Sequence, residues 1–360
     1  MPPSSLYVHI PFCSSLCAYC DFPKVLYRND WAESYLSALF REIELRKIGK
    51  VKTIYVGGGT PSCLPFSSLE KLLSFLSPHL EQGGEFSFEA NPESLTKEKA
   101  CLLHRLGVNR VSLGVESSLP SFLKKLKRNH TFEDAVEAVK NLREAGITNL
   151  NADWMIALPG ETLGDLKKEE RAFLSLGVDH LSVYTLILEE GTLFSLQKVK
   201  PLKEEEEAAQ FEEVLSCLRE AGYERYEVSN FCRNGKKCLH NLVYWKDEEF
   251  YGVGMGASGF VDGRRYANTR SLSSYIKGEG LEIASDVSGE EDFLLTNLRL
   301  QEGFSLAHFK NRCGRDFLAA YGDKLAKLEK EGLLKRWRGS IVPTDRGIEL
   351  LDYVLLTLIA

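Results

Sequence analysis

The chain has 360 residues, 44% of them hydrophobic and 27% charged, which is the composition of an ordinary globular protein with one large domain and one smaller domain. Its formal net charge of -6 argues against nucleic acid as a partner, because that binding depends on clustered lysine and arginine. No basic and apolar leader precedes Leu6, and no stretch approaches the roughly 18 to 20 apolar residues that cross a bilayer, so we expect a cytoplasmic protein with at most peripheral membrane contact.

Short apolar or β-branched runs recur in the first half of the chain, and the segments between them have apolar residues at every third or fourth position. The runs predict strands and the intervening segments predict amphipathic helices. The expected strands cover residues 5–10, 52–59, 85–92, 109–116, 148–155 and 178–186. Thr96, and Thr131 together with Asp134, resemble helix N-caps. Six alternations of strand and helix predict a parallel α/β sheet, either an open doubly wound sheet or a partial barrel.

Polar motifs stand where the expected strands end. The cysteine-rich loop follows the first strand, GGGTP (57–61) ends the second, and EANPE (89–93) ends the third. Glu116 and Asp153 stand at the ends of the fourth and fifth strands. Because ligands bind at the carboxyl ends of the strands in both architectures, we expect these motifs to share one site.

In the second half of the chain, the regular alternation of expected strands and helices ends. An acidic helix is expected over 203–223, followed by a glycine-rich strip at 250–260. Residues 285–360 predict a small, mostly helical, winged-helix-like C-terminal domain, with a hairpin within 332–347 and a final apolar helix over 348–359. This last helix is too short to span a membrane, so we expect it to pack on the body of the protein.

Three of the nine cysteines, Cys13, Cys17 and Cys20, have the spacing C-x3-C-x2-C. A cytosolic chain keeps its thiols reduced, so such a group predicts a metal site or a catalytic site rather than disulfides. A structural zinc ion needs four ligands, usually as two pairs, and the sequence has no second CxxC; a zinc-stabilised binding module remains an alternative. A [4Fe-4S] cluster held by three cysteines leaves one iron open to another ligand, and Cys63 is the one distant candidate for a fourth thiolate.

The GGGTP segment removes side chains at the end of a strand, so that backbone groups can approach a ligand closely. Its glycines have neither the GxGxxG spacing nor the P-loop spacing of nucleotide-binding motifs. The segment ends the second expected strand, and the loop with three thiols follows the first. The segment therefore predicts a pocket for the ligand of the open iron.

The cysteine loop and GGGTP together resemble the radical S-adenosylmethionine (SAM) superfamily, in which a [4Fe-4S] cluster binds SAM through its amino and carboxylate groups at the unique iron. More narrowly, YVHIPFC, GGGTPS, SLGVESS, LKRNH and NADWMIALPGET resemble the family of the oxygen-independent coproporphyrinogen oxidase HemN and its relative HemW. The resemblance covers essentially the whole chain. It implies a partial (β/α)6 barrel over 1–270, which carries the cofactor motifs, and a HemN-type C-terminal domain over 285–360.

The resemblance also implies roles for individual residues. Cys13, Cys17 and Cys20 would bind the cluster. The SAM pocket would include Tyr7, Tyr19, Phe22, Gly58, Gly59, Thr60, Glu89, Glu116, Arg128 and Asp153. Arg128 can pair with the carboxylate of SAM, and Asp153 can accept hydrogen bonds from ribose hydroxyls. The family usually has glutamine in place of Glu116, so a carboxylate replaces an amide donor here.

Two features favour the HemW branch over the oxidase branch. The oxidase pattern continues with a fourth cysteine, whereas Asp21 and Phe22 follow Cys20 here, and the chain begins almost directly at its first strand. The segment CLHNLVYW matches the HNxxYW motif of HemW through His240, Asn241, Tyr244 and Trp245. His240 offers an imidazole to heme iron, and the two aromatic side chains offer flat faces to a porphyrin.

The resemblance therefore implies a heme chaperone that binds heme, a [4Fe-4S] cluster and SAM, and passes heme to an acceptor protein that the sequence does not identify. The alternative is an enzyme, a coproporphyrinogen III oxidase that abstracts hydrogen from propionate side chains with a 5'-deoxyadenosyl radical. The SAM-binding motifs are compatible with both functions, so the sequence leaves open whether the protein is an enzyme.

Overall fold

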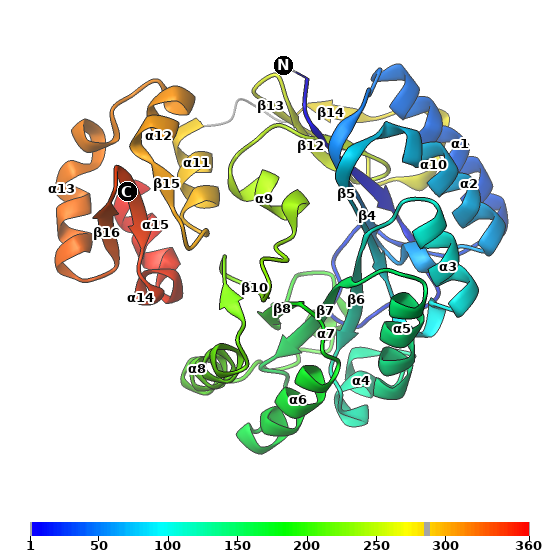
Figure 1. The fold of residues 1–360 in the computed structure, drawn as a ribbon, viewed down its shortest axis with the longest axis horizontal. Coiled ribbons are helices and arrows are strands. Elements are labelled where there is room, and N and C mark those ends of the chain that lie inside the picture. Colours follow the sequence, from blue (N-terminus) through cyan, green and yellow to red (C-terminus); the bar gives the residue numbers. More distant parts are fainter. Residues whose placement is uncertain (1, 284–288, 360) are drawn as a thin grey trace.

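A computed structural model describes residues 2–283 and 289–359 of the chain (Figure 1). The expected start of the second domain, at residue 285, lies outside the described residues. All six strands that the sequence predicts are present and pair in parallel. They are β1 (Ser5–Ile10), β4 (Val51–Gly58), β5 (Leu80–Ala90), β6 (Arg110–Glu116), β7 (Asn149–Ile156) and β8 (His180–Thr185).

The order of the strands decides between the two architectures. Strands β1, β4, β5, β6, β7 and β8 are neighbours in the order in which they occur in the sequence, without the reversal of a doubly wound sheet. Strand β11 (Tyr251–Val253) extends the sheet in parallel beside β1, and β10 (Asn230–Cys232) and β9 (Glu224–Arg225) extend it beyond β8. The sheet thus runs from β11 to β9 as an open arc, which confirms the partial barrel.

Helices cover the convex side of this arc (Figure 1). They are α1 (Asn29–Leu45), α2 (Phe66–Leu76), α3 (Lys97–Arg105), α4 (Pro120–Leu126), α5 (Phe132–Glu144) and α6 (Leu163–Ser175). The predicted N-caps are confirmed: Thr96 accepts from the backbone of Lys99, and Thr131 and Asp134 form a reciprocal capping box. These caps fix the positions at which α3 and α5 begin.

The inner side of the sheet is polar. Successive side chains of a strand point to opposite faces of the sheet. In β5, Phe86 and Phe88 are fully buried in the hydrophobic core, and Glu85, Ser87 and Glu89 therefore lie on the other face. Similar buried polar residues come from the neighbouring strands: Ser5, Thr53, Arg110, Ser112, Asn151 and His180. The barrel therefore has a polar interior, unlike the apolar layers that fill a closed eight-stranded barrel.

The second half of the chain adds elements around this barrel. They are α7 (Leu193–Leu196), α8 (Glu204–Glu220), α9 (Leu239–Trp245), α10 (Leu272–Lys277) and a small sheet of β12 (Ser258–Val261), β13 (Arg264–Asn268) and β14 (Leu281–Ile283). Helix α8 is the predicted acidic helix. Helix α9 contacts β4 and β5 on one side and α11 (Gly289–Asn297) on the other, so it lies between the barrel and the C-terminal elements (Figure 1).

The C-terminal elements pack around their own hydrophobic core, which contains Phe293, Phe309 and Phe317. They are α11, β15 (Phe304–Ser305), α12 (Leu306–Cys313), α13 (Phe317–Lys330), β16 (Leu334–Trp337), β17 (Ser340–Pro343), α14 (Asp345–Glu349) and α15 (Leu351–Ile359). The predicted hairpin is β16–β17, but the predicted final helix is divided at Leu350, which caps α14. No helix within the described ranges is long and apolar enough to cross a membrane.

Candidate functional site

The three clustered cysteines lie on one loop at the carboxyl end of β1. Cys13 is buried at the end of β2 (Phe12–Cys13), and Cys17 and Cys20 are partly buried before β3 (Val25–Leu26). Backbone hydrogen bonds fix the loop between two other segments: Ala18 donates to Leu126 at 3.0 Å and accepts from Phe194 at 3.0 Å. The three thiols are thus held beside the carboxyl ends of the strands, as the sequence predicts.

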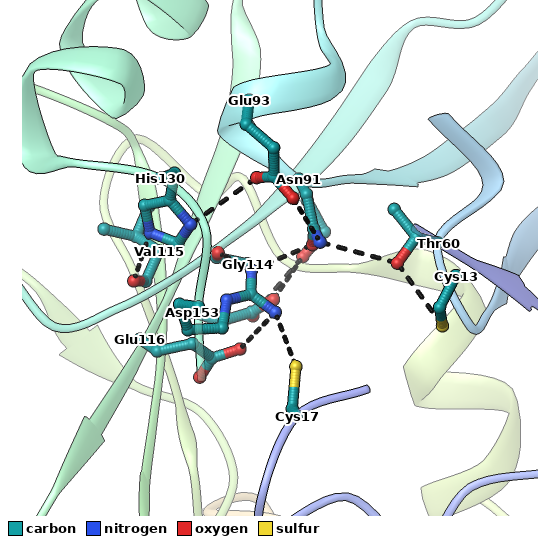
Figure 2. Close-up of polar contacts among 12 residues, drawn as sticks. Cys13, Cys17, Thr60, Asn91, Glu93, Gly114, Val115, Glu116, His130 and Asp153 are labelled. Atoms are coloured by element: carbon teal, nitrogen blue, oxygen red, sulfur yellow. Dashed lines mark hydrogen bonds and ion pairs between the residues drawn. The ribbon is translucent and has the colours of Figure 1, made fainter. Parts of the chain in front are cut away.

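The local environment keeps the thiols of Cys13 and Cys20 neutral when no cation is bound. Burial raises the pKa of Cys13 to about 11 and also raises the pKa of Cys20. Two donors point at the sulfurs: Thr60 Oγ1 lies 3.6 Å from Cys13 Sγ, and Arg128 Nη1 lies 3.5 Å from Cys17 Sγ (Figure 2). In the part of the chain that the structure describes, no group of three His, Cys, Asp or Glu residues is arranged to hold a metal ion. A bound iron centre would supply the positive charge that converts these thiols into thiolate ligands.

The GGGTP turn is pressed against this loop. Gly59 and Thr60 donate backbone hydrogen bonds to Ile10 and Phe12 at 2.8 and 2.7 Å. A Cβ atom on Gly59 would lie 2.8 Å from the carbonyl oxygen of Phe12 and 2.9 Å from Cys13 Sγ. The turn therefore has no room for a side chain here, and its backbone lies directly against the segment that carries Cys13.

Gly58→Ala should destabilise the fold, because Gly58 has a φ of +116° and an added Cβ would lie 2.6 Å from the His9 ring. A strained backbone conformation alone costs about 1–3 kcal/mol. We expect the free energy of unfolding, measured by urea denaturation, to fall by at least this amount. Gly49→Ala is the matched control, since nothing lies within 4 Å of an added Cβ there. Equal urea midpoints for Gly58→Ala and the unchanged protein would contradict the expectation.

Glu89 anchors the turn from the next strand. Its Oε2 accepts the backbone N–H of Gly58 at 2.9 Å, and its Oε1 accepts the hydroxyl of Tyr55 at 2.8 Å. A Cβ on Gly57 would lie 2.7 Å from the carboxyl carbon of Glu89, so the carboxylate fills the space next to the turn. Burial raises the pKa of Glu89, and the two hydrogen bonds counteract this effect.

Arg128 contacts both the cysteine loop and the acidic side chain of Glu116. Its Nη2 donates to Asn91 Oδ1 at 2.9 Å and to the carbonyl of Gly114, and its Nη1 lies 4.0 Å from Glu116 Oε1. Its Nε is buried without a hydrogen-bond partner among the described residues. A guanidinium that is not fully satisfied beside the thiols suits a carboxylate ligand.

Two further carboxylates face the same space. Glu116 has a φ of 65° and accepts the hydroxyl of Tyr184 at 2.6 Å. Asp153 accepts from Asn151 Nδ2 at 2.7 Å, and burial, followed by the charges of Glu116 and Glu89, raises its pKa to about 7. Three carboxyl groups, of which Glu116 is buried and Glu89 and Asp153 are half-buried, favour a positively charged ligand in the space beside Arg128. SAM carries a sulfonium and an ammonium group together with a carboxylate, so the residues present fit it.

The aromatic residues implied for this pocket occupy different positions. The hydroxyl of Tyr7 is hydrogen-bonded to His9 Nδ1 at 2.9 Å, and its ring lies 6.2 Å from that of Tyr55. Tyr19 packs on the apolar cluster around Phe194, and burial, followed by the charge of Glu116, raises its pKa. The side chain of Phe22 lies at the surface and is 60% exposed, so the structure does not bring it into the pocket with the others.

The HNxxYW segment forms α9, and its histidine points into the barrel. His240 is fully buried, with Nδ1 bonded to Thr53 Oγ1 at 2.7 Å and Nε2 bonded to the hydroxyl of Tyr244 at 2.8 Å. Glu85 Oε1 accepts the backbone N–H of His240 at 3.1 Å, which fixes the start of the helix. Burial lowers the pKa of His240 to about 3, so the ring is neutral. Both ring nitrogens are therefore engaged within the protein.

Trp245, at the end of the motif, contacts the C-terminal part of the chain. Asn241 and Trp245 are half-buried, and the guanidinium of Arg299 lies 4.4 Å from the centre of the Trp245 ring. Next to the motif, Asp247 is bonded to Arg265 at 3.0 Å and to Arg312 of α12 at 2.9 Å. These contacts join the outer side of α9 to the C-terminal elements.

Sequence reasoning missed Tyr55, Glu85, Asn91 and Arg110. Arg110 is 2% exposed, and its Nε and Nη1 have no hydrogen-bond partner among the described residues. Burial acts to lower the pKa of Arg110, but the neighbouring Cys238 and Glu85 outweigh this effect and raise that pKa; the guanidinium in turn partly offsets the rise in the pKa of Glu89. The signal that could have found these residues is the polar alternation within predicted strands, at 53, 55 and 57 and at 85, 87 and 89.

Residues 7–172 match the model of the radical SAM superfamily, and residues 291–350 match that of the HemN C-terminal domain. The chain is 38% identical to the heme chaperone HemW of Lactococcus lactis, over 97% of this chain and 95% of that protein. The chain belongs to the HemW family of radical SAM proteins. The HemW of Bacillus subtilis is 35% identical over 95% of this chain and 96% of its own length.

The HemW fold seen here also resembles a solved structure. Coproporphyrinogen III oxidase (HemN) from Escherichia coli superposes with a TM-score of 0.86 at 23% identity, over 99% of this chain and 90% of that chain. This likeness confirms the predicted fold, and the HemW relatives confirm the branch that the motifs indicated. Membership of the radical SAM superfamily implies a [4Fe-4S] cluster and SAM as cofactors.

Proposed function

We propose that this protein is a heme chaperone that binds heme together with a [4Fe-4S] cluster and SAM, and transfers heme to an acceptor protein in the cytoplasm. The observation that carries the proposal is His240 within HNxxYW, in a chain whose relatives are named heme chaperones. A neutral imidazole is the form that ligates heme iron, and burial keeps His240 neutral. Asn241, Tyr244 and Trp245 would complete the heme site.

Heme ligation by His240 requires a change in α9. Nε2 must exchange its hydrogen bond to Tyr244 for iron, and the ring must leave its fully buried position beside Thr53. Helix α9 has seven residues, and its outer side is held by the C-terminal elements. We propose the two domains on this basis, with residues 1–270 carrying the cofactor sites and residues 285–360 covering the heme motif.

The cofactor motifs would keep separate roles in such a chaperone. Cys13, Cys17 and Cys20 would hold three irons, and the fourth iron would remain for SAM. The GGGTP backbone and Arg128 would bind the methionine part of SAM, while Glu89, Glu116 and Asp153 would balance its positive charge. When bound, the cluster supplies an electron that can cleave SAM. Whether the protein is a chaperone or an oxidase, the acidic pocket of this chain would bind and orient SAM, and the thiol loop would hold the cluster.

A heme titration of the anaerobically reconstituted protein tests the proposal. We expect one heme per chain with a Soret band, and His240→Ala should weaken binding by about tenfold, the value of one lost ligand contact of about 1.4 kcal/mol. His104→Ala is the matched control, because His104 is exposed on α3. Conversion of coproporphyrinogen III by the reduced protein, with consumption of SAM, would instead support the oxidase, and a Soret band independent of His240 would remove the basis of the heme site.

A further inference from the structure

Tyr55 contacts the heme motif directly and is connected to the GGGTP turn through Glu89. Its ring stacks on that of His240, with centroids 5.3 Å apart and an interplanar angle of 29°. Its hydroxyl donates to Glu89 Oε1 at 2.8 Å, and Glu89 Oε2 accepts the backbone N–H of Gly58 at 2.9 Å. A continuous path of contacts therefore runs from His240 to the turn.

Each member of this path is also held from its other side. Thr53 and Tyr244 engage the two ring nitrogens of His240. At the opposite end, an added Cβ on Gly57 would lie 2.7 Å from the carboxyl carbon of Glu89, so this carboxylate is in close contact with the turn. Since packed interiors adjust in discrete steps, a ligand that fixes Glu89 also fixes the position of the Tyr55 hydroxyl.

We infer that Tyr55 is a positioning residue that couples ligand binding at the GGGTP turn to heme binding at His240. This inference rests on the proposed function, because it takes His240 as the heme ligand and Glu89 as part of the SAM pocket. Heme ligation requires the His240 ring to leave its stack on Tyr55. Two ligands that favour different positions of one element must oppose each other.

The direction of the coupling follows from the charges. A positively charged ligand at the turn is attracted to the half-buried carboxylate of Glu89 and holds it in place, together with the Tyr55 hydroxyl that donates to it. SAM therefore stabilises the arrangement in which His240 is buried, and it weakens heme binding. By linkage, heme weakens SAM binding by the same factor. One partly buried hydrogen bond carries the effect, so we expect a factor of roughly three to ten.

The coupling is measured by titrating heme into the cluster-loaded protein with and without saturating SAM, with the Soret absorbance as the readout. The dissociation constant for heme should rise by roughly three- to tenfold with SAM, and calorimetric titration of SAM with and without heme should give the same factor. Tyr55→Phe keeps the ring beside His240 and removes the hydroxyl. We expect the SAM-dependent difference to fall below about twofold in this variant, with the Soret band still present.

Tyr184→Phe is the matched control, because the Tyr184 hydroxyl donates to Glu116 in the same pocket but is not part of the path to His240. This variant should retain the SAM-dependent difference. If heme binding depends on His240 but its dissociation constant does not change with SAM, the coupling is overturned and the proposed function stands. The same conclusion follows if Tyr55→Phe keeps the full SAM-dependent difference in heme affinity. Heme binding that does not depend on His240 in the unchanged protein would overturn the proposed function and the coupling with it.

Discussion

Cys17→Ala is expected to abolish assembly of the [4Fe-4S] cluster. Three thiolates serve three irons, so removing one leaves two irons without a protein ligand, and the loop offers no replacement. The substitution also removes the sulfur that Arg128 Nη1 contacts at 3.5 Å. After anaerobic reconstitution we expect iron and sulfide to fall from roughly four of each per chain to near zero, with loss of the broad brown absorbance.

Cys63→Ala is the control for this result. Cys63 lies next to GGGTP, but its Sγ donates to the carbonyl oxygen of Phe12 at 3.4 Å, and burial raises its pKa to about 12. It is a neutral thiol engaged with the backbone, so the variant should assemble a full cluster. Loss of iron from Cys63→Ala together with retention in Cys17→Ala would contradict the assignment of the ligands. One bound zinc without sulfide in the unchanged protein would contradict the cluster itself.

Much of the barrel could be predicted, because the residues of each strand and helix themselves indicate its secondary structure. Apolar runs and helical spacing located all six parallel strands, and the capping pair Thr131 and Asp134 marked the start of α5. The site on the carboxyl rim followed from the same reasoning, since Glu116 ends β6 and Asp153 belongs to the neighbouring β7; the expectation that Asp153 ends its strand was wrong, because β7 continues to Ile156. The choice between an open doubly wound sheet and a partial barrel needed the strand order, which no local pattern contains.

The contacts that connect the HNxxYW motif to the GGGTP turn could not be predicted, because the residues that make them are far apart in the sequence. Glu85 accepts the backbone N–H groups of Leu239 and His240, which are more than 150 residues away. The HNxxYW letters predict a histidine near aromatic side chains, but they do not reveal that Tyr55 is one of those aromatics. The tertiary fold alone connects His240 to the GGGTP turn through two side chains, Tyr55 and Glu89.

Asp153→Asn is expected to stabilise the folded protein at alkaline pH much more than at acidic pH. The pKa of Asp153 is about 7 in the folded protein, because of burial followed by the charges of Glu116 and Glu89, whereas an unfolded aspartate has a pKa near 3.9. Between these values the folded state binds a proton that the unfolded state does not, so stability is lost as the pH rises from about 4 to about 7. The loss is absent below pH 4 and complete above pH 7.

Asparagine removes this ionisation and can still accept from Asn151 Nδ2, which is 2.7 Å from Asp153 Oδ1. Urea unfolding at pH 5 and pH 8 measures the effect, and we expect the advantage of Asp153→Asn to grow by about 2–3 kcal/mol between them. Glu116→Gln removes the second cause of the raised pKa, so the growth should be smaller in that background. An advantage independent of pH would mean that Asp153 is already ionised in the fold, and the three carboxylates would then form a stronger attraction for a cationic ligand than we infer.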